Sequence, residues 1–451
     1  MTRVYLIAAV ALAPLAAGRA AADEAEPKPV PATRPEMKQA LEDLKHRQPR
    51  LPLAPPTAEE VAGGRVPVNN ARMRARHLPA DLRDGGGFLR GGERGMTLDP
   101  TFKTLLFWVV SRANNCHYCL GHQERKLAAA GVSDDRLAAL DADWSAFTPA
   151  ERAAFAFTRK LTYEPHALTA ADLDALRAHY SESEALEIVL AVAGFNAMNR
   201  WTDSLGIPQE DSGEALLRAT GGRPPANLKT FLTPTSPAFL DRPSIVAPIG
   251  DTAPGRPRSA VVVKRPPPES RAEVEQKLAE IAHRQPRLKP ADEAATRAAL
   301  PATWPAGPVP NWVRLLARFP QSGVPRAASL RTAEEKGVLS PVLKGRIAWV
   351  AARHDRAWYA LGQAQRQLRA LGQSDDAIFA LDGDGASLPV ADREALAFVR
   401  KLTVAPQRIT DDDIAHLREH YADAAVAEIV YRVTNAAFLN RVTEAAALPL
   451  E

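Results

Sequence analysis

Two cysteines are the residues of this sequence most suited to chemistry. Cys116 and Cys119 are the only cysteines among 451 residues, and they lie three positions apart. Residues with this spacing are neighbours on one face of a helix. A disulfide between them would close a very short loop and would therefore stabilise the fold little. The spacing favours a redox-active dithiol over a structural disulfide.

The surrounding residues can activate such a pair. A helix is expected to end just before Cys116 and another to begin there, and the positive end of a helix dipole stabilises a thiolate. His117 and His122 can add positive charge or act as bases, and helical spacing brings His122 near Cys119. We therefore expect Cys119, Cys116 and His122 to be the catalytic residues.

Other uses of the motif are a zinc site, a haem attachment site and an inert disulfide. A structural zinc site needs four ligands, and no second cluster of cysteine and histidine accompanies Cys116, Cys119 and His122 or His117. Covalent haem needs a histidine directly after the second cysteine, where this chain has Leu120. We expect neither a metal nor another cofactor, and the inert disulfide stays open.

Charge and the N-terminus narrow the class of protein. The chain has 57 basic and 53 acidic residues, without a basic stripe interleaved with aromatic residues, which argues against nucleic-acid binding. Arg3, an apolar run over 4–17 and Ala20-Ala21-Ala22 are typical of a secretory signal over residues 1–22. That run is too short to span a bilayer. We expect a secreted or periplasmic protein with no membrane segment after cleavage.

The rest of the sequence repeats itself. The run Arg159-Lys160-Leu161-Thr162 recurs 241 residues later as Arg400-Lys401-Leu402-Thr403. The same interval relates several further pairs: Trp108 and Trp349, Ser133-Asp134-Asp135 and Ser374-Asp375-Asp376, His179-Tyr180 and His420-Tyr421, Asn199-Arg200 and Asn440-Arg441, and Pro208 and Pro449. This predicts two copies of one domain, over 23–220 and 269–451, joined by a Pro-rich linker over 221–268.

Both predicted domains are expected to be helical. Apolar residues recur at helical spacing after Pro100, and Thr148-Pro149 is typical of an N-cap followed by Pro in the first turn. Thr169 and Ser181 open further helices, the second expected to end near Asn199. No useful strand pattern is present, so the sequence predicts an all-α fold built as a tandem duplication.

The segment from Asn114 to His122, with the preceding Leu-rich helix, resembles the carboxymuconolactone decarboxylase and alkylhydroperoxidase D superfamily, in particular its peroxidase-related branch. The resemblance covers most of 65–208, including the run Asn196-Ala197-Met198-Asn199-Arg200, and a second copy over 308–450. It implies an all-α fold, assembly as an intramolecular pseudo-dimer or a homo-oligomer, and peroxide reduction by the cysteine pair. Cys119 would be the peroxidatic residue and Cys116 the resolving one.

The match to the family's proton relay is incomplete. Thr104 stands where the family has a relay glutamate, and Gln123 where it has a relay histidine, so His122 would have to substitute. The lactone-decarboxylase branch generally lacks the cysteine pair, which argues against that reaction. In the second copy the cysteine positions hold Ala357 and Ala360, and the position of His122 holds Gln363. The second copy is therefore degenerate.

These observations predict an exported thiol-dependent oxidoreductase, an antioxidant peroxidase whose Cys116/Cys119 pair passes through a disulfide. Its partners would be a small peroxide or disulfide substrate and a thiol reductant of unknown identity. One alternative is a non-catalytic binding or scaffold protein of the same fold with a vestigial disulfide, and another is a metal or small-ligand site on that fold.

Overall fold

The computed structural model describes residues 26–63, 66–83, 93–210, 230–250 and 258–451. Within these ranges the chain forms helices and loops, with one isolated β-bridge between Ile249 and Ala260 and no strand. The predicted all-α class is confirmed. The predicted signal segment, 1–22, lies outside the described residues. No helix in the described ranges is long and apolar enough to cross a bilayer.

The N-terminal half, taken here as residues 26–210, contains nine α-helices among its described residues. They are α1 (Arg34–Asp43), α2 (Ala58–Ala62), α3 (Asn69–His77), α4 (Pro100–Ala113), α5 (His117–Ala129), α6 (Asp134–Ala142), α7 (Pro149–Tyr163), α8 (Ala170–Arg177) and α9 (Glu182–Ser204).

The C-terminal half, residues 269–451, follows the same order after its first helices. Its helices are α11 (Arg271–Ile281), α12 (Glu293–Ala299), α13 (Asn311–Leu316), α14 (Pro320–Glu335), α15 (Pro341–Asp355), α16 (Trp358–Ala370), α17 (Asp375–Phe379), α18 (Val390–Val404), α19 (Asp411–His420) and α20 (Asp423–Ala445). Helices α15 to α20 each begin 241 residues after α4 to α9.

Local capping explains where the helices begin. Asp99 accepts from the backbone of Phe102 and caps α4, while Thr148 and Glu151 form a capping box at α7. A third cap, Ser181 with Glu184, opens α9. The predicted end of α9 near Asn199 is wrong: the helix continues to Ser204, and Gly206, with φ of 59°, terminates it.

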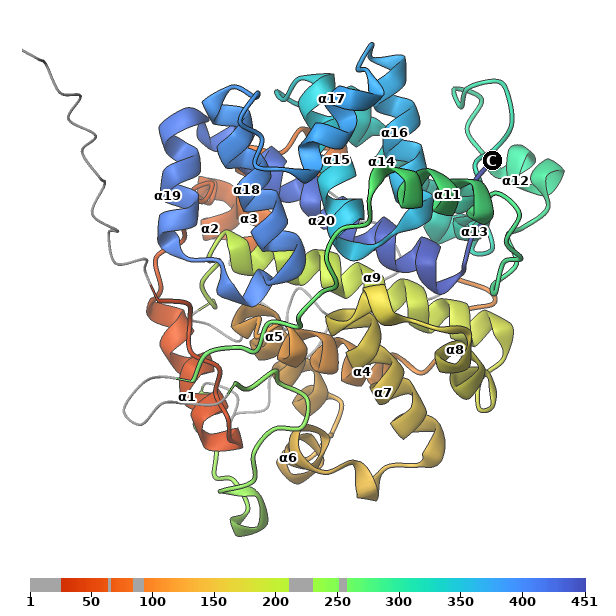
Figure 1. Cartoon of the computed structure of the whole chain (residues 1–451). Helices are drawn as coiled ribbons and strands as arrows, with labels where there is room; N and C mark the ends of the chain where they lie inside the picture. The colour runs from red at the N-terminus through yellow and green to blue at the C-terminus, as the bar shows by residue number, and fades with distance from the viewer. Residues whose placement is uncertain (1–25, 64–65, 84–92, 211–229, 251–257) are drawn as a thin grey trace, which may run out of the picture.

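The two halves pack through the long helices α9 and α20, which lie side by side across the middle of the molecule (Figure 1). Arg200 of α9 donates to the carbonyl of Thr403 in α18, at 3.2 Å. Arg441 of α20 donates to the carbonyl of Thr162 in α7, at 3.0 Å. Each arginine thus satisfies a carbonyl at the C-terminal end of a helix in the opposite half, where helical backbone partners run out.

Buried or partly buried ion pairs also recur at the 241-residue interval. Lys103 pairs with Glu187 at 2.7 Å, and Lys344 pairs with Glu428 at 3.4 Å. The other two pairs are Arg112–Asp141 at 3.0 Å and Arg353–Asp382 at 2.8 Å. The order of these helices and the positions of these ion pairs therefore match at the interval of 241 residues, and the tandem duplication stays a prediction.

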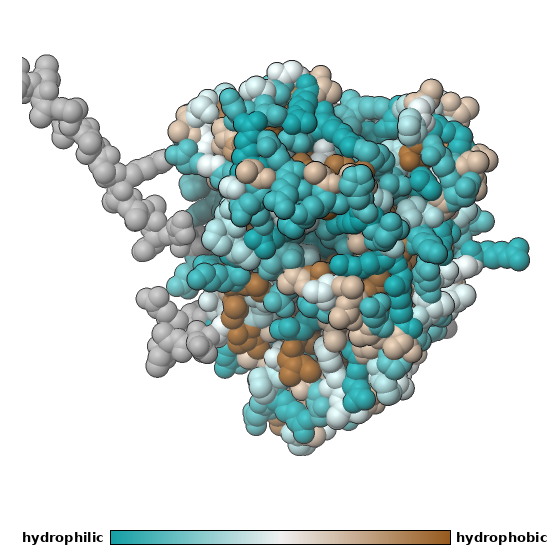
Figure 2. Space-filling model, turned by 45° about the vertical axis from the view of Figure 1, so that its right-hand side comes forward, coloured by the Kyte–Doolittle hydropathy of each residue, from teal (hydrophilic) through white to brown (hydrophobic). Residues whose placement is uncertain are grey.

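The described parts of the predicted linker lie against the N-terminal half instead of crossing open solvent. Phe231 is buried under the guanidinium of Arg125, and the Ser244 backbone donates to Ala32. Farther along, Arg265 pairs with the buried Asp355 of the C-terminal half at 2.9 Å. The face drawn in Figure 2 is mostly hydrophilic, with apolar side chains in small groups.

Candidate active site

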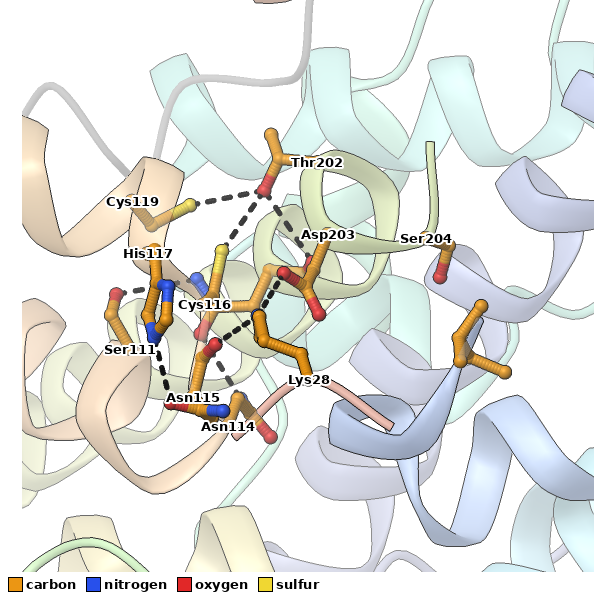
Figure 3. Close-up of polar contacts among 12 residues, drawn as sticks. Lys28, Ser111, Asn114, Asn115, Cys116, His117, Cys119, Thr202, Asp203 and Ser204 are labelled. Atoms are coloured by element: carbon orange, nitrogen blue, oxygen red, sulfur yellow. Dashed lines mark hydrogen bonds and ion pairs between the residues drawn. The ribbon is translucent and has the colours of Figure 1, made fainter. Parts of the chain in front are cut away.

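The dithiol lies at the turn between α4 and α5 (Figure 3). Asn115 adopts a left-handed conformation with φ of 51°, which asparagine tolerates better than most residues, and the chain reverses there. Cys116 is the N-cap residue of α5, and its backbone N–H donates to the Ser111 carbonyl at 2.8 Å. Cys119 follows in the first turn of α5. The predicted helix boundary at the cysteines is therefore confirmed.

The two sulfurs share one hydroxyl partner. Cys116 and Cys119 lie 3.4 Å apart as free thiols, and both are buried. Each sulfur is 3.2 Å from the Oγ1 atom of Thr202, which projects from α9 toward both (Figure 3). The same hydroxyl donates to the Met198 carbonyl of its own helix at 3.0 Å. Since a threonine hydroxyl has a single proton, the two sulfurs and this carbonyl compete for it.

The surroundings of the two thiols favour ionisation of one of them. Burial opposes ionisation of Cys119, but hydrogen bonds with Cys116, Thr202 and Asn199 outweigh it and lower the pKa of its thiol. Burial, then the hydrogen bond and charge of Cys119, raise the pKa of the Cys116 thiol well above its ordinary value. Cys119 is therefore the sulfur that ionises first, with Cys116 as a neutral donor beside it.

The two histidines have separate surroundings. Burial, followed by the positive charges of Lys28, Arg112 and Arg47, holds the pKa of His117 well below its ordinary range. This ring is therefore neutral at pH 7, and one of its nitrogens lies 2.9 Å from the side-chain oxygen of Asn115. His117 thus contributes no positive charge to the dithiol.

His122 faces a carboxylate instead of a sulfur. Its Nε2 atom is 3.1 Å from Glu210, and its ring lies against that of Tyr118. Glu210 also accepts from the Tyr118 hydroxyl at 2.8 Å and from the Asn69 backbone at 2.8 Å. Burial opposes ionisation of Glu210, but the charge of His122 and these hydrogen bonds lower its pKa to about 2. No described hydrogen bond joins His122 to either sulfur.

The other two relay positions do not reach the dithiol through any described contact. The Thr104 hydroxyl donates to the Pro100 carbonyl of its own helix at 2.8 Å. Gln123 is buried, and its side-chain oxygen has no hydrogen-bond partner among the described residues. Of the groups hydrogen-bonded to Cys119, the Cys116 thiol and the Thr202 hydroxyl are the ones that can both give and take a proton.

A cavity of about 570 Å³ opens beside His117. Lys28 lines it and pairs with Asp203 at 2.6 Å, next to the turn that holds Cys116 (Figure 3). The Lys28 charge favours, and the Asp203 charge opposes, ionisation of Cys116. Among the described residues, no group of three or more histidine, cysteine, aspartate or glutamate side chains could hold a metal ion.

The structure adds Thr202, Glu210 and Lys28 to the residues expected from sequence. Thr202 lies more than 80 residues from the cysteines in the sequence. The residues around the cysteine motif therefore gave no indication of it, and a single threonine is not a recognisable sequence signal. Thr202 and Glu210 recur at the 241-residue interval as Thr443 and Glu451. That repetition was the only available signal, and it does not distinguish a structural residue from a catalytic one.

Replacing Thr202 by valine, which keeps the shape but removes the hydroxyl, is expected to slow alkylation of Cys119. The rate at pH 7 should fall roughly tenfold or more, because a hydrogen bond to a charged group contributes about 1.5–3 kcal/mol. Iodoacetamide labelling followed by peptide mass spectrometry measures it. Thr443→Val is the matched control, since Thr443 makes the same bond to its own helix, at 2.8 Å to Leu439, without a nearby sulfur. Equal labelling of the two variants would contradict the assigned role.

Comparison with known proteins agrees with the sequence pattern. Residues 89–160 match the model of the carboxymuconolactone decarboxylase family. Two solved structures of the debrominase Bmp8 also resemble the chain. The complex with 2,3,4-tribromopyrrole is 19% identical, covers 42% of this chain and 94% of its own, and gives a TM-score of 0.30. The apo form is 20% identical to this chain, and the match covers 41% of this chain and 90% of the debrominase chain, with a TM-score of 0.29. None of the curated proteins matches. Residues 89–160, which include both cysteines, therefore resemble the carboxymuconolactone decarboxylase family.

Proposed function

We propose that this chain is an exported thiol-dependent oxidoreductase that reduces small peroxides. The observation that carries the proposal is the unequal pair of thiols, 3.4 Å apart, in which Cys119 ionises before Cys116. The thiolate is the nucleophile in thiol chemistry, and a neighbouring thiol can resolve the oxidised product.

The reaction has two steps on the protein. The Cys119 thiolate attacks one peroxide oxygen, the O–O bond breaks, and the leaving hydroxide takes a proton to become water. Cys116 then attacks the resulting Cys119 sulfenic acid, the S–S bond forms, and the hydroxyl leaves as a second water. Two electrons from an external thiol reductant restore the pair. Because both sulfurs are buried, hydrogen peroxide is favoured over bulky alkyl peroxides.

A rapid-mixing titration tests the proposal. Reduced protein mixed with hydrogen peroxide should lose two thiols per peroxide, faster than free cysteine under the same conditions. Cumene hydroperoxide should react more slowly than hydrogen peroxide. Thiol loss no faster than that of free cysteine would contradict peroxidase function.

The second candidate is a non-catalytic binding or scaffold protein with a vestigial disulfide. The lack of a described relay contact from Thr104, Gln123 or His122 to a sulfur favours it. Slow oxidation in the titration above, together with a reduction potential below about −300 mV, typical of structural disulfides, would support it.

We also propose that the two halves form an intramolecular pseudo-dimer. The reciprocal bonds of Arg200 and Arg441 across α9 and α20 support this assembly. Export rests on the signal-like N-terminal sequence alone. Detection of the mature chain in the exported fraction, beginning near residue 23, would test it.

A further inference from the structure

The C-terminal half contains a cavity at the position that corresponds to the dithiol site. Its volume is about 400 Å³, within the range of small-molecule sites. Ala360 lines it, 241 residues after Cys119, as do Tyr359 and Thr443, 241 residues after Tyr118 and Thr202. The cavity therefore has the framework of the dithiol site without its reactive groups.

Loss of two aromatic rings accounts for the space. In the N-terminal half Phe107 of α4 and Phe195 of α9 stack with ring centroids 4.1 Å apart, and both are buried. The residues 241 positions later are Ala348 and Ala436, which line the cavity and are only partly buried. Two nearly parallel rings are thus replaced by methyl groups, which leaves apolar space where a planar ring can lie.

The cavity wall also offers aromatic surface. Trp304 and Trp312 line it beside several prolines. The charged side chains at its edge are already paired: Arg331 with Glu335 at 2.8 Å, and Glu334 with Arg432. A flat, uncharged ligand fits such a wall better than an ion, because a charged ligand would lose its hydration without gaining a free counter-charge.

One polar group in the wall lacks a partner. Asn435 is buried, and Arg326 donates to its side-chain oxygen at 3.2 Å. Because a guanidinium can only donate, this bond fixes the amide with its NH₂ group directed away from Arg326. The Nδ2 atom is buried and has no hydrogen-bond partner among the described residues, and the residue lines the cavity. The N-terminal half has Gly194 at the corresponding position.

A buried donor without a partner is unfavourable, and a hydrogen-bond acceptor on a ligand would remove that cost. From this amide, the aromatic wall and the vacated ring positions, we propose that the C-terminal half binds a neutral planar aromatic compound with a carbonyl oxygen. The carbonyl accepts from the Asn435 amide, and the ring lies between Ala348 and Ala436. This site is independent of the thiol chemistry proposed for the N-terminal half.

Fluorescence titration of the full chain with Prodan, a neutral naphthalene ketone, tests this inference. We expect saturable binding of one Prodan per chain, displaced by acetophenone. Ala436→Phe and Ala348→Phe each return a ring to the cavity and should weaken binding about tenfold or more, a change equivalent to about 1.4 kcal/mol. Asn435→Ala should weaken binding and shift the emission of bound Prodan to shorter wavelength, because its carbonyl loses a hydrogen bond.

Ala370→Phe is the matched control, since it adds a ring at an exposed position of α16, the helix that carries Ala360, and should bind as the unmodified chain does. Circular dichroism establishes that each variant is folded. If either phenylalanine variant fails to fold, Ala348→Leu fills part of the same space and decides the question. Absence of saturable binding, failure of acetophenone to compete, or unchanged affinity in the folded filling variants would overturn the inference.

Discussion

Replacing Cys119 by serine is expected to abolish the rapid reaction of the reduced protein with hydrogen peroxide. Cys119 is the thiol whose pKa is lowered by its hydrogen bonds, and serine cannot supply a thiolate at neutral pH. Stopped-flow measurement of peroxide loss should fall to the rate of a protein-free blank. An unchanged rate in Cys119→Ser would remove this residue from the proposed reaction.

Cys116→Ser provides the matched control. This variant keeps Cys119 and the Thr202 hydroxyl, so the first oxidation should still occur. It cannot form the intramolecular disulfide, so a sulfenic acid should accumulate on Cys119 and react with dimedone. If Cys119→Ser and Cys116→Ser both lost the first oxidation to the same extent, the two sulfurs would have no separate roles.

The second large effect is expected at the contact between the halves. Arg441→Met should lower the free energy of unfolding by about 3–5 kcal/mol, the usual cost of removing one partner of a buried ion pair. Arg441 is fully buried, 3.6 Å from Asp355, and it also donates to the Leu161 and Thr162 carbonyls. Urea denaturation followed by circular dichroism measures the change.

The charges around Asp355 explain why this arginine matters. Burial opposes ionisation of Asp355, but the positive charges of Arg441, Arg265 and Arg200 hold its pKa at about 2. Burial lowers the pKa of Arg441 to about 10, with Asp355 acting in the opposite direction. Removing Arg441 leaves a buried carboxylate with fewer partners, which is costly in a low-dielectric interior.

Two variants act as controls for this effect. Arg200→Met removes similar hydrogen bonds, but no described ion pair joins Arg200 to a carboxylate, so we expect a smaller cost of about 1–3 kcal/mol. Adding Asp355→Asn to Arg441→Met should lower the stability further, because Arg265 pairs with Asp355 at 2.9 Å and would then lose its partner. Equal destabilisation by the two arginine variants, with no further loss in the double variant, would rule out this explanation.

Much of the helical framework could be predicted from sequence because helix ends depend on residues within one turn. Asp99, Thr148 and Ser181 accept hydrogen bonds from backbone N–H groups three positions later, and the corresponding helices begin there. The end of α9 is also set locally, by a signal that the expected end near Asn199 left out. Gly206 adopts a left-handed conformation with φ of 59°, and the backbone N–H groups of Gly206 and Ile207 donate to the carbonyls of Asp203 and Thr202, which terminates the helix after Ser204.

The sequence by itself determined the Cys116 and Cys119 motif and predicted chemistry there, since their spacing and the helix start between them are local. It also determined that the C-terminal half lacks these groups. Only the tertiary structure brought Thr202 between the sulfurs, turned His122 toward Glu210 and left a cavity between Ala348 and Ala436. Each of these depends on α9 or α20, or on the segments after them, packing against helices about 80 to 90 residues earlier in the chain. The physical reason is that such contacts follow from packing of whole helices, whereas caps and i, i+3 pairs depend only on near neighbours.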